Sequence, residues 1–155
     1  MDRAGTDCRP VRDRIQSGQS RRCWLAQHPI EIILVRQWAS YIAAPVWIVD
    51  PSGNLLYCNE AAESITGVHF DEENDAPVDT YAARFDVCDL DGTPLMTEDL
   101  PIAVALAKQV AAHREMKIQD MEGVWRHIEV TGIPLIGQDG RLLGAMAMFW
   151  EVGKK

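Results

Sequence analysis

Residues 45–67, with the sequence PVWIVDPSGNLLYCNEAAESITG, predict three structural elements in direct succession. A short apolar run ends at Asp50, and residues 51–54 supply the proline, serine, glycine and asparagine of a tight turn before a second apolar run begins. The two runs are therefore expected to pair as a β-hairpin. Asn59 then stands at a helix N-cap position and Gly67 at a C-cap position, so a short helix is expected between them.

The charge of the chain is divided unevenly between its beginning and the rest. Residues 1–28 contain six arginines and three aspartates, a net charge of +3, whereas the whole chain has a formal net charge of −8. Residues 1–28 also lack periodic apolar content, which predicts a disordered basic tail. The remaining residues are acidic, and this argues against nucleic-acid binding, because affinity for nucleic acid comes largely from Lys and Arg that neutralise phosphates.

The length and composition predict one folded domain and a tail. A chain of 155 residues, 47% of them hydrophobic, is long enough for a single core. Its most apolar stretch, residues 30–49, is interrupted by Glu31, Arg36 and Pro45, so neither a membrane span nor a signal peptide is expected. The four cysteines form no C-x-x-C pair, so neither a zinc site nor a disulfide framework is expected. We therefore expect a cytoplasmic protein.

An amphipathic helix is expected over residues 29–44, in front of the hairpin. Pro29 suits the first helical position, and apolar residues follow at helical spacing on two faces. One face is expected to cover the sheet and the other to contact a second copy of the chain. Packing into the core of a single copy is the alternative. The predicted dimer interface consists of Ile32, Val35, Trp38, Ala39 and Ile42.

The second half of the chain predicts short helices followed by a three-stranded meander. Residues 71–79 form an acidic connector, and residues 81–88 are expected to form short helical turns. A longer helix is expected to open at Thr97 and to end near Val110. The last strands are expected at residues 114–119, 125–135 and 142–152, where apolar residues alternate between turn signals. This order of elements indicates an α+β fold.

Several spaced motifs in this order resemble those of PAS domains, the small sensory modules of signalling proteins. They are D-x-x-G-x-x-x-x-x-N-x-A from Asp50, D-G-T-P-L from Asp91, and G-x-x-R-x-I-x-V-T-x-x-P-L from Gly123. The resemblance implies a PAS domain over residues 45–152. Its fold would be a five-stranded antiparallel sheet, in the strand order 2-1-5-4-3, with short helices on one face and the flanking helix at the N-terminus.

The same resemblance implies a non-catalytic signalling function. Such a module would act through dimerisation and regulated protein–protein interaction, with a histidine kinase or a transcription regulator as the partner. Small molecules often bind between the sheet and the helices of PAS domains. A small apolar ligand would here contact the apolar side chains of the last three strands, and a plain hydrophobic core is the alternative interpretation. These side chains are Met116, Ile118, Ile128, Val130, Met146 and Met148.

The resemblance also allows two PAS cofactors to be judged against the residues present. Haem-binding members ligate iron through a histidine on the longer helix, and residues 97–110 contain no histidine. Flavin-binding members read the ring with polar amides on the sheet, and Ile118, Ile128 and Met146 are expected at those positions. Both observations argue against haem and flavin.

A small cone-shaped α+β enzyme of the steroid-isomerase kind is the alternative function. It would use a buried carboxylate, Asp50 or Asp120, as a general base. That role requires a carboxyl group inside an apolar cavity with a raised pKa. Asp50 follows a strand directly before a turn, where solvent is expected, so its position argues against this alternative.

Overall fold

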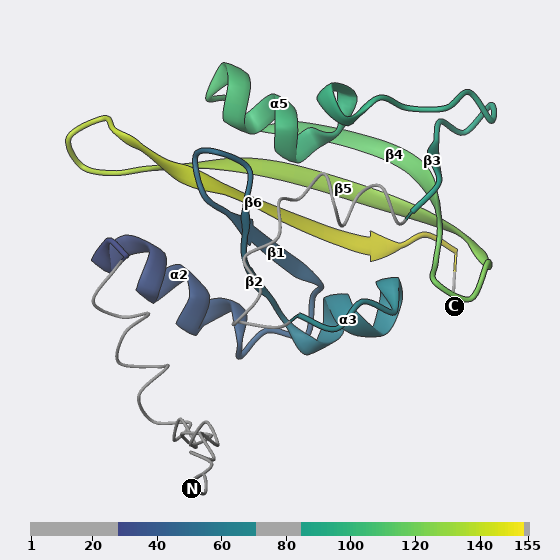
Figure 1. Cartoon of the computed structure of the whole chain (residues 1–155), viewed down its shortest axis with the longest axis horizontal. Helices are drawn as coiled ribbons and strands as arrows, with labels where there is room; N and C mark the ends of the chain where they lie inside the picture. The colour runs from purple at the N-terminus through teal and green to yellow at the C-terminus, as the bar shows by residue number, and fades with distance from the viewer. Residues whose placement is uncertain (1–27, 71–84, 154–155) are drawn as a thin grey trace, which may run out of the picture.

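The computed structural model of the chain describes residues 28–70 and 85–153, and Figure 1 shows their arrangement. The predicted tail, except for His28, and the predicted connector lie outside these residues. The helices and strands follow in the order α2 (Ile30–Ala39), β1 (Val46–Val49), β2 (Leu55–Cys58), α3 (Glu60–Thr66), β3 (Val87–Cys88), the 3-10 helix η1 (Thr97–Asp99), α5 (Pro101–Lys108), β4 (Ala112–Gln119), β5 (Trp125–Ile136) and β6 (Leu142–Glu151).

The strands form one antiparallel sheet in the order β2-β1-β6-β5-β4-β3. The predicted order 2-1-5-4-3 is confirmed, because the last three predicted strands correspond to β4, β5 and β6. The sheet has six strands rather than the predicted five. The additional strand, β3, has two residues and lies at one edge of the sheet.

The prediction of helical turns over residues 81–88 is wrong at β3. Val87 pairs with Ile118 of β4, and the carbonyl of Asp86 accepts a hydrogen bond from the backbone N–H of Gln119 at 2.9 Å. On its other side, the carbonyl of Val87 accepts from the N–H of Leu95. The partners in β4, Ile118 and Gln119, are distant in sequence, and Leu95 belongs to a segment without regular secondary structure. Two residues are also too few to show an alternating pattern. The strand is therefore a product of tertiary pairing.

The hairpin and the short helix predicted at residues 45–67 are present. The Oδ1 atom of Asp50 accepts hydrogen bonds from the backbone N–H groups of Ser52 and Asn54, both at 2.8 Å, which closes the turn between β1 and β2. The side-chain oxygen of Asn59 accepts from the N–H of Ala62 and caps α3. Gly67 ends the helix with φ +72°, in the left-handed region that glycine adopts without strain.

Asn59 also joins three elements that are distant in sequence. Besides capping α3, its side-chain oxygen accepts a hydrogen bond from the N–H of Val46, at 2.9 Å, where β1 begins. Its amide group donates to the carbonyl of Ala39, at the end of α2, and to the carbonyl of Ala44, at 3.1 and 2.8 Å. With 3% of its surface exposed, Asn59 therefore satisfies four backbone groups inside the fold.

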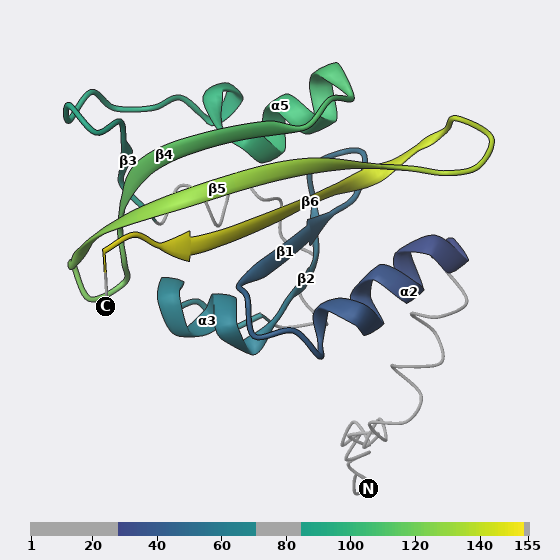
Figure 2. The same ribbon diagram turned by 180° about the vertical axis from the view of Figure 1, so that it is seen from behind.

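Helix α2 lies on the face of the sheet opposite α5, as Figures 1 and 2 show. Two apolar clusters result. The cluster on the outer face joins α2 to β1 and β6 through Ile32, Ile48 and Met146. The cluster on the inner face lies between the sheet and the helices α3 and α5. Both faces of the central strands are thus covered, which explains why β1 and β6 are apolar at nearly every position.

The longer helix begins later than the predicted start at Thr97. Residues Thr97–Asp99 form the 3-10 helix η1, and Leu100 has extended backbone angles, φ −69° and ψ 138°. Proline disfavours a helical conformation in the residue before it, and Pro101 then opens α5. The start of α5 lies directly on Gly132 of β5, where a Cβ atom would collide with the carbonyl of Pro101. This close approach sets the distance between α5 and the sheet.

Candidate functional site

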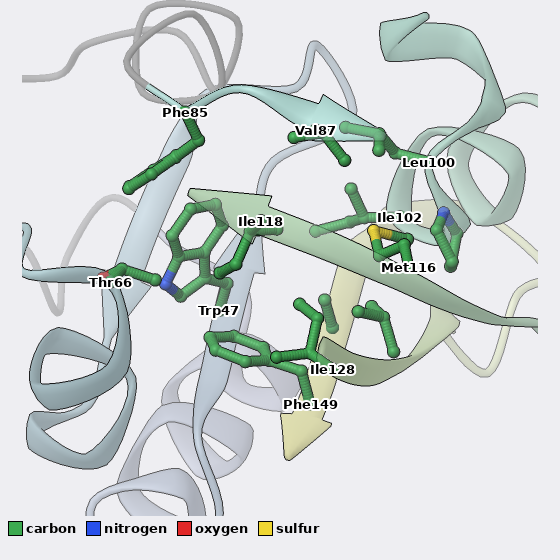
Figure 3. A pocket seen from close by; sticks show the side chains of 13 residues that line it. Trp47, Thr66, Phe85, Val87, Leu100, Ile102, Met116, Ile118, Ile128 and Phe149 are labelled. Carbon is green, nitrogen blue, oxygen red and sulfur yellow. The ribbon is translucent and has the colours of Figure 1, made fainter. Parts of the chain in front are cut away.

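A cavity of about 80 Å³ lies between the inner face of the sheet and the helices, and Figure 3 shows the side chains around it. Leu100, Pro101 and Ile102, at the start of α5, line it on the helical side. Val87 of β3 and Phe85 line it at the edge of the sheet. The cavity is therefore bounded by segments from both halves of the domain.

Four of the six predicted ligand-binding residues line this cavity. Met116 and Ile118 come from β4, and Ile128 and Val130 from β5. All four are buried, with at most 8% of their surface exposed. The alternation of apolar and polar residues in these two strands thus identifies the side chains of the inner face. Contact of these side chains with a ligand stays a prediction.

The placement predicted for Met146 and Met148 on the inner face is wrong. Val130 pairs with Phe149, and Thr131 pairs with Met148, so Phe149 and Ala147 face the cavity. Met146 and Met148 instead belong to the apolar cluster under α2. The sequence of β6 conceals this register because both of its faces are buried and apolar, and a shift by one residue reverses the two faces.

The sequence-based prediction also missed the aromatic wall of the cavity. The ring of Trp47 packs edge-on against Phe149, with ring centroids 5.9 Å apart, and lies 6.2 Å from the ring of Phe85. The register of β1 and β6 places Trp47 and Phe149 on one face, because Trp47 pairs with Ala147, two residues before Phe149. The sequence alone does not contain this register.

Trp47 and Thr66 lie at one end of the cavity, and their polar atoms are buried in its wall rather than exposed inside it. Both line it, and in the view of Figure 3 the indole nitrogen is on the side of the ring that faces Thr66. Cys58 lies next to them in the inner cluster as a free thiol, and burial raises its pKa to about 12, with a further contribution from Glu63. The indole N–H of Trp47 lowers that pKa slightly, although it does not reach hydrogen-bond geometry with the sulfur. Cys58 is therefore protonated at neutral pH and unsuited to be a nucleophile.

The lining does not fit haem or flavin. The described side chains around the cavity include no histidine to ligate iron and no asparagine or glutamine to bind the polar edge of a flavin ring. A volume of about 80 Å³ is also smaller than the roughly 150 Å³ of an apolar protein cavity that binds benzene, a single ring. Within residues 28–70 and 85–153, no group of three or more His, Cys, Asp or Glu side chains could hold a metal ion.

Neither candidate general base lies in the cavity. Asp50 is engaged in the turn between β1 and β2, where Asn54 also donates its side-chain amide to Oδ2 at 2.8 Å. Asp120 is buried in the turn between β4 and β5 and accepts hydrogen bonds from Val124, Arg126 and Glu122. The Val124 N–H and the Arg126 guanidinium hold the pKa of Asp120 below its usual value. A general base at neutral pH would need a raised pKa, so the geometry argues against the isomerase-type mechanism.

An open groove at the β3 edge of the sheet contains the basic side chains of Lys117, Arg126 and His127, and each of them has a partner. Arg126 bridges Asp120 and Glu151 at 2.8 and 3.4 Å, and His127 lies 3.0 Å from Glu115. Lys117 donates a hydrogen bond to a backbone carbonyl. These groups stabilise the sheet edge and its turns, and the groove offers a ligand little unpaired positive charge.

Most residues of the predicted dimer interface pack onto the sheet within a single copy of the chain. Ile32 and Ala39 are 1% and 0% exposed, because they pack onto the outer face of the sheet. Val35 and Ile42 are half-buried against the same cluster, so of the five predicted residues only Trp38 is largely exposed. The exposed side of α2 and the residues after it carry a different set of large apolar side chains, which we call the α2 stripe: Ile30, Leu34, Trp38 and Tyr41.

Solved structures with the same architecture are PAS domains. The PAS domain of BvgS from Bordetella pertussis is 17% identical, with a TM-score of 0.56, over 81% of this chain and 88% of that one. The PAS domain of the fruit-fly ELK potassium channel is 10% identical, with a TM-score of 0.61, over 78% and 96% of the two chains. A PAS domain from a two-component sensor histidine kinase is 12% identical, with a TM-score of 0.51, over 79% and 96%.

The sequence profile of the PAS fold family matches residues 41–155, and the chain belongs to this family. PAS domains are sensory and signalling modules and are generally non-catalytic. No curated protein sequence matches the chain. Among the described helices, none is long and apolar enough to cross a membrane.

Proposed function

We propose that this PAS domain is a non-catalytic sensor that dimerises through the α2 stripe and transmits the occupancy of its cavity by a small apolar ligand. The observation that carries the proposal is the exposure of the stripe. Ile30, Leu34, Trp38 and Tyr41 are 62%, 56%, 48% and 81% exposed, although the opposite side of α2 is packed into the fold. Large apolar side chains gathered on one exposed surface are typical of a protein–protein interface.

A second copy of the chain is the occupant that we propose for this surface. In a two-fold symmetric dimer the same patch meets itself, so the stripe of one copy would cover the stripe of the other. Tryptophan and tyrosine supply much of the binding energy in such interfaces, and the stripe contains one of each. The dimer would thereby remove from water the apolar surface that a single copy exposes.

Helix α3 provides a physical connection between the cavity and the stripe. Its last residue, Thr66, lines the cavity, and its N-cap, Asn59, is hydrogen-bonded to the carbonyls of Ala39 and Ala44. A ligand that displaces α3 would therefore act on the end of α2 and on the segment that joins α2 to β1. We propose this connection as the path by which binding changes the dimer.

The downstream partner that we propose is a histidine kinase or a transcription regulator. Support comes from the shared fold of a PAS domain from a two-component sensor histidine kinase. The dimer would present the partner with a surface whose geometry depends on the cavity. Partner binding would thus be regulated without a catalytic step in this domain.

Oligomeric state measured by native mass spectrometry and light scattering tests the proposal. Leu34→Glu and Trp38→Glu each place a charge inside the stripe, and both are expected to convert the dimer into monomers. Ala107→Glu is the matched control, because Ala107 is exposed on α5 and accepts the same charge away from the stripe. Dimers that persist in both stripe variants would contradict the proposal, and so would a monomeric wild-type protein.

A further inference from the structure

The described wall of the cavity presents no hydrogen-bonding group to its interior. Of the thirteen lining side chains, only those of Trp47 and Thr66 contain a nitrogen or oxygen atom. The hydroxyl of Thr66 donates to the carbonyl of Ala62 at 2.8 Å, within α3. The indole nitrogen of Trp47 is inaccessible to solvent and therefore has no surface inside the cavity. A molecule in the cavity would meet hydrocarbon groups and the thioether of Met116, as Figure 3 shows.

The polarity of the wall, and not the volume, excludes water from this cavity. A volume of about 80 Å³ exceeds the roughly 30 Å³ that one molecule occupies in liquid water. A buried water molecule, however, needs about two to four polar partners, and the described lining provides none. The wall atoms of a dry cavity lack dispersion contacts on one side, and an apolar molecule would supply these contacts.

The size of the cavity limits the molecule that it can hold. Its volume of about 80 Å³ is roughly half of the 150 Å³ that binds benzene, a ring of six carbons, so about three non-hydrogen atoms fit. Two contacts hold the walls in place. The start of α5 rests on Gly132, where a Cβ atom would collide with the carbonyl of Pro101. The ring of Trp47 packs edge-on against Phe149, with centroids 5.9 Å apart.

We infer that the ligand of this cavity is a non-polar molecule of about three non-hydrogen atoms, the size of a short hydrocarbon, that forms no hydrogen bond with the protein. This inference rests on the proposed ligand-binding function and adds to it the size and the polarity of the ligand. A charged ligand is excluded, because no ionic side chain lies in the described lining to offset the cost of burying a charge. The apolar core itself would bind such a molecule, without a cofactor.

Titration with three probes, followed through the methyl resonance of Met116, tests the inference. Met116 lines the cavity, and its resonance is distinguished from those of the other methionines by its loss in Met116→Leu. Cyclopropane, a three-carbon ring, is expected to shift this resonance until the cavity is saturated. Dimethyl ether has the same number of non-hydrogen atoms. It is expected to bind at least about 10-fold more weakly, because its oxygen leaves water without finding a donor in the wall. Benzene is expected to leave the resonance unchanged.

A substitution in the wall tests whether cyclopropane binds in this cavity. Ala147→Val fills part of the space and is expected to weaken the binding of cyclopropane by at least about 5-fold. Ala107→Val is the matched control, because Ala107 is exposed on α5 outside the described lining, and it should leave the binding unchanged. Equal binding of cyclopropane by the wild-type protein and Ala147→Val would place the probe elsewhere and overturn the inference.

The probes also separate a failure of this inference from a failure of the proposed function. Benzene that binds as tightly as cyclopropane would overturn the inference on size, and dimethyl ether that binds as tightly would overturn it on polarity. Either result leaves the ligand-binding function intact. If none of the three probes shifts the resonance of Met116, the proposed ligand function fails as well. Should Ala147→Val not fold, the comparison of the three probes in the wild-type protein decides alone.

Discussion

Replacement of Asn59 by alanine should be among the most destabilising single substitutions in this domain. The side chain accepts hydrogen bonds from the N–H groups of Val46 and Ala62 and donates to the carbonyls of Ala39 and Ala44. Asn59→Ala removes all four bonds and leaves these backbone groups without their partner in a site where the side chain is 3% exposed. It also removes the N-cap of α3.

The magnitude follows from the number and burial of these bonds. A hydrogen bond contributes about 1 kcal/mol net to stability, and a partner that stays buried and unpaired adds to the loss. Four bonds therefore correspond to about 4 kcal/mol, a large part of the roughly 5 to 15 kcal/mol that stabilises a typical domain. Asn54→Ala is the matched control. The Asn54 amide donates one hydrogen bond, to Asp50 in a partly buried turn, so about 1 kcal/mol is expected.

Urea denaturation followed by circular dichroism measures both variants against the wild-type protein. The midpoint should fall much further for Asn59→Ala than for Asn54→Ala, at an unchanged slope. If the two variants lost the same free energy of unfolding, Asn59 would not be the residue that joins α2, β1 and α3. The proposed path from the cavity to the α2 stripe would then lose its physical basis.

Three further substitutions test the packing and the electrostatics. Gly132→Ala should lower the free energy of unfolding by about 1 to 3 kcal/mol in urea denaturation, because a Cβ collides with the carbonyl of Pro101 and lifts α5 from β5; an unchanged stability would refute this close contact. Ala147→Val should raise the free energy of unfolding in urea denaturation by up to about 1 kcal/mol, since it fills part of the cavity; a loss of stability would show that the space is already filled. Asp120→Asn should be less stable than the wild-type protein at pH 7 and should approach it below about pH 4. The pKa of Asp120 is lowered in the folded state, so its contribution is present above the unfolded pKa and is lost as the pH falls through the folded one; a gap that stays constant down to pH 2.5 in urea denaturation would contradict the pairing with Arg126.

The sequence predicts this fold well where local signals and long-range pairing agree. The turn after Asp50, the N-cap at Asn59 and the C-cap at Gly67 are local features, and the structure contains each of them. The strands β4 and β5 alternate clearly, because only one of their faces is buried over most of their length. That alternation correctly identifies four residues of the cavity wall.

The prediction fails where both faces of an element are apolar. In β6 no polar residue marks the outer face, so Met146 and Phe149 could not be assigned to a side without the register of β5. In α2 the side that packs on the sheet and the exposed side are both apolar. The sequence therefore does not reveal that Ile32 is buried and Leu34 is exposed. Hydrophobic periodicity locates such elements, but tertiary pairing decides which face is which.

The most direct test of the proposed sensor function is the dimer dissociation constant with and without an occupied cavity. Sedimentation equilibrium would be measured on the wild-type protein in buffer and with cyclopropane, a three-carbon apolar probe, at a concentration that saturates the shift of the methyl resonance of Met116 in the cavity wall. Because binding and dimerisation are thermodynamically linked, a ligand that acts on α2 must change this constant. We predict a dimer whose dissociation constant differs between the two conditions. A protein that stays monomeric, or a dimer with the same dissociation constant in both, would contradict it.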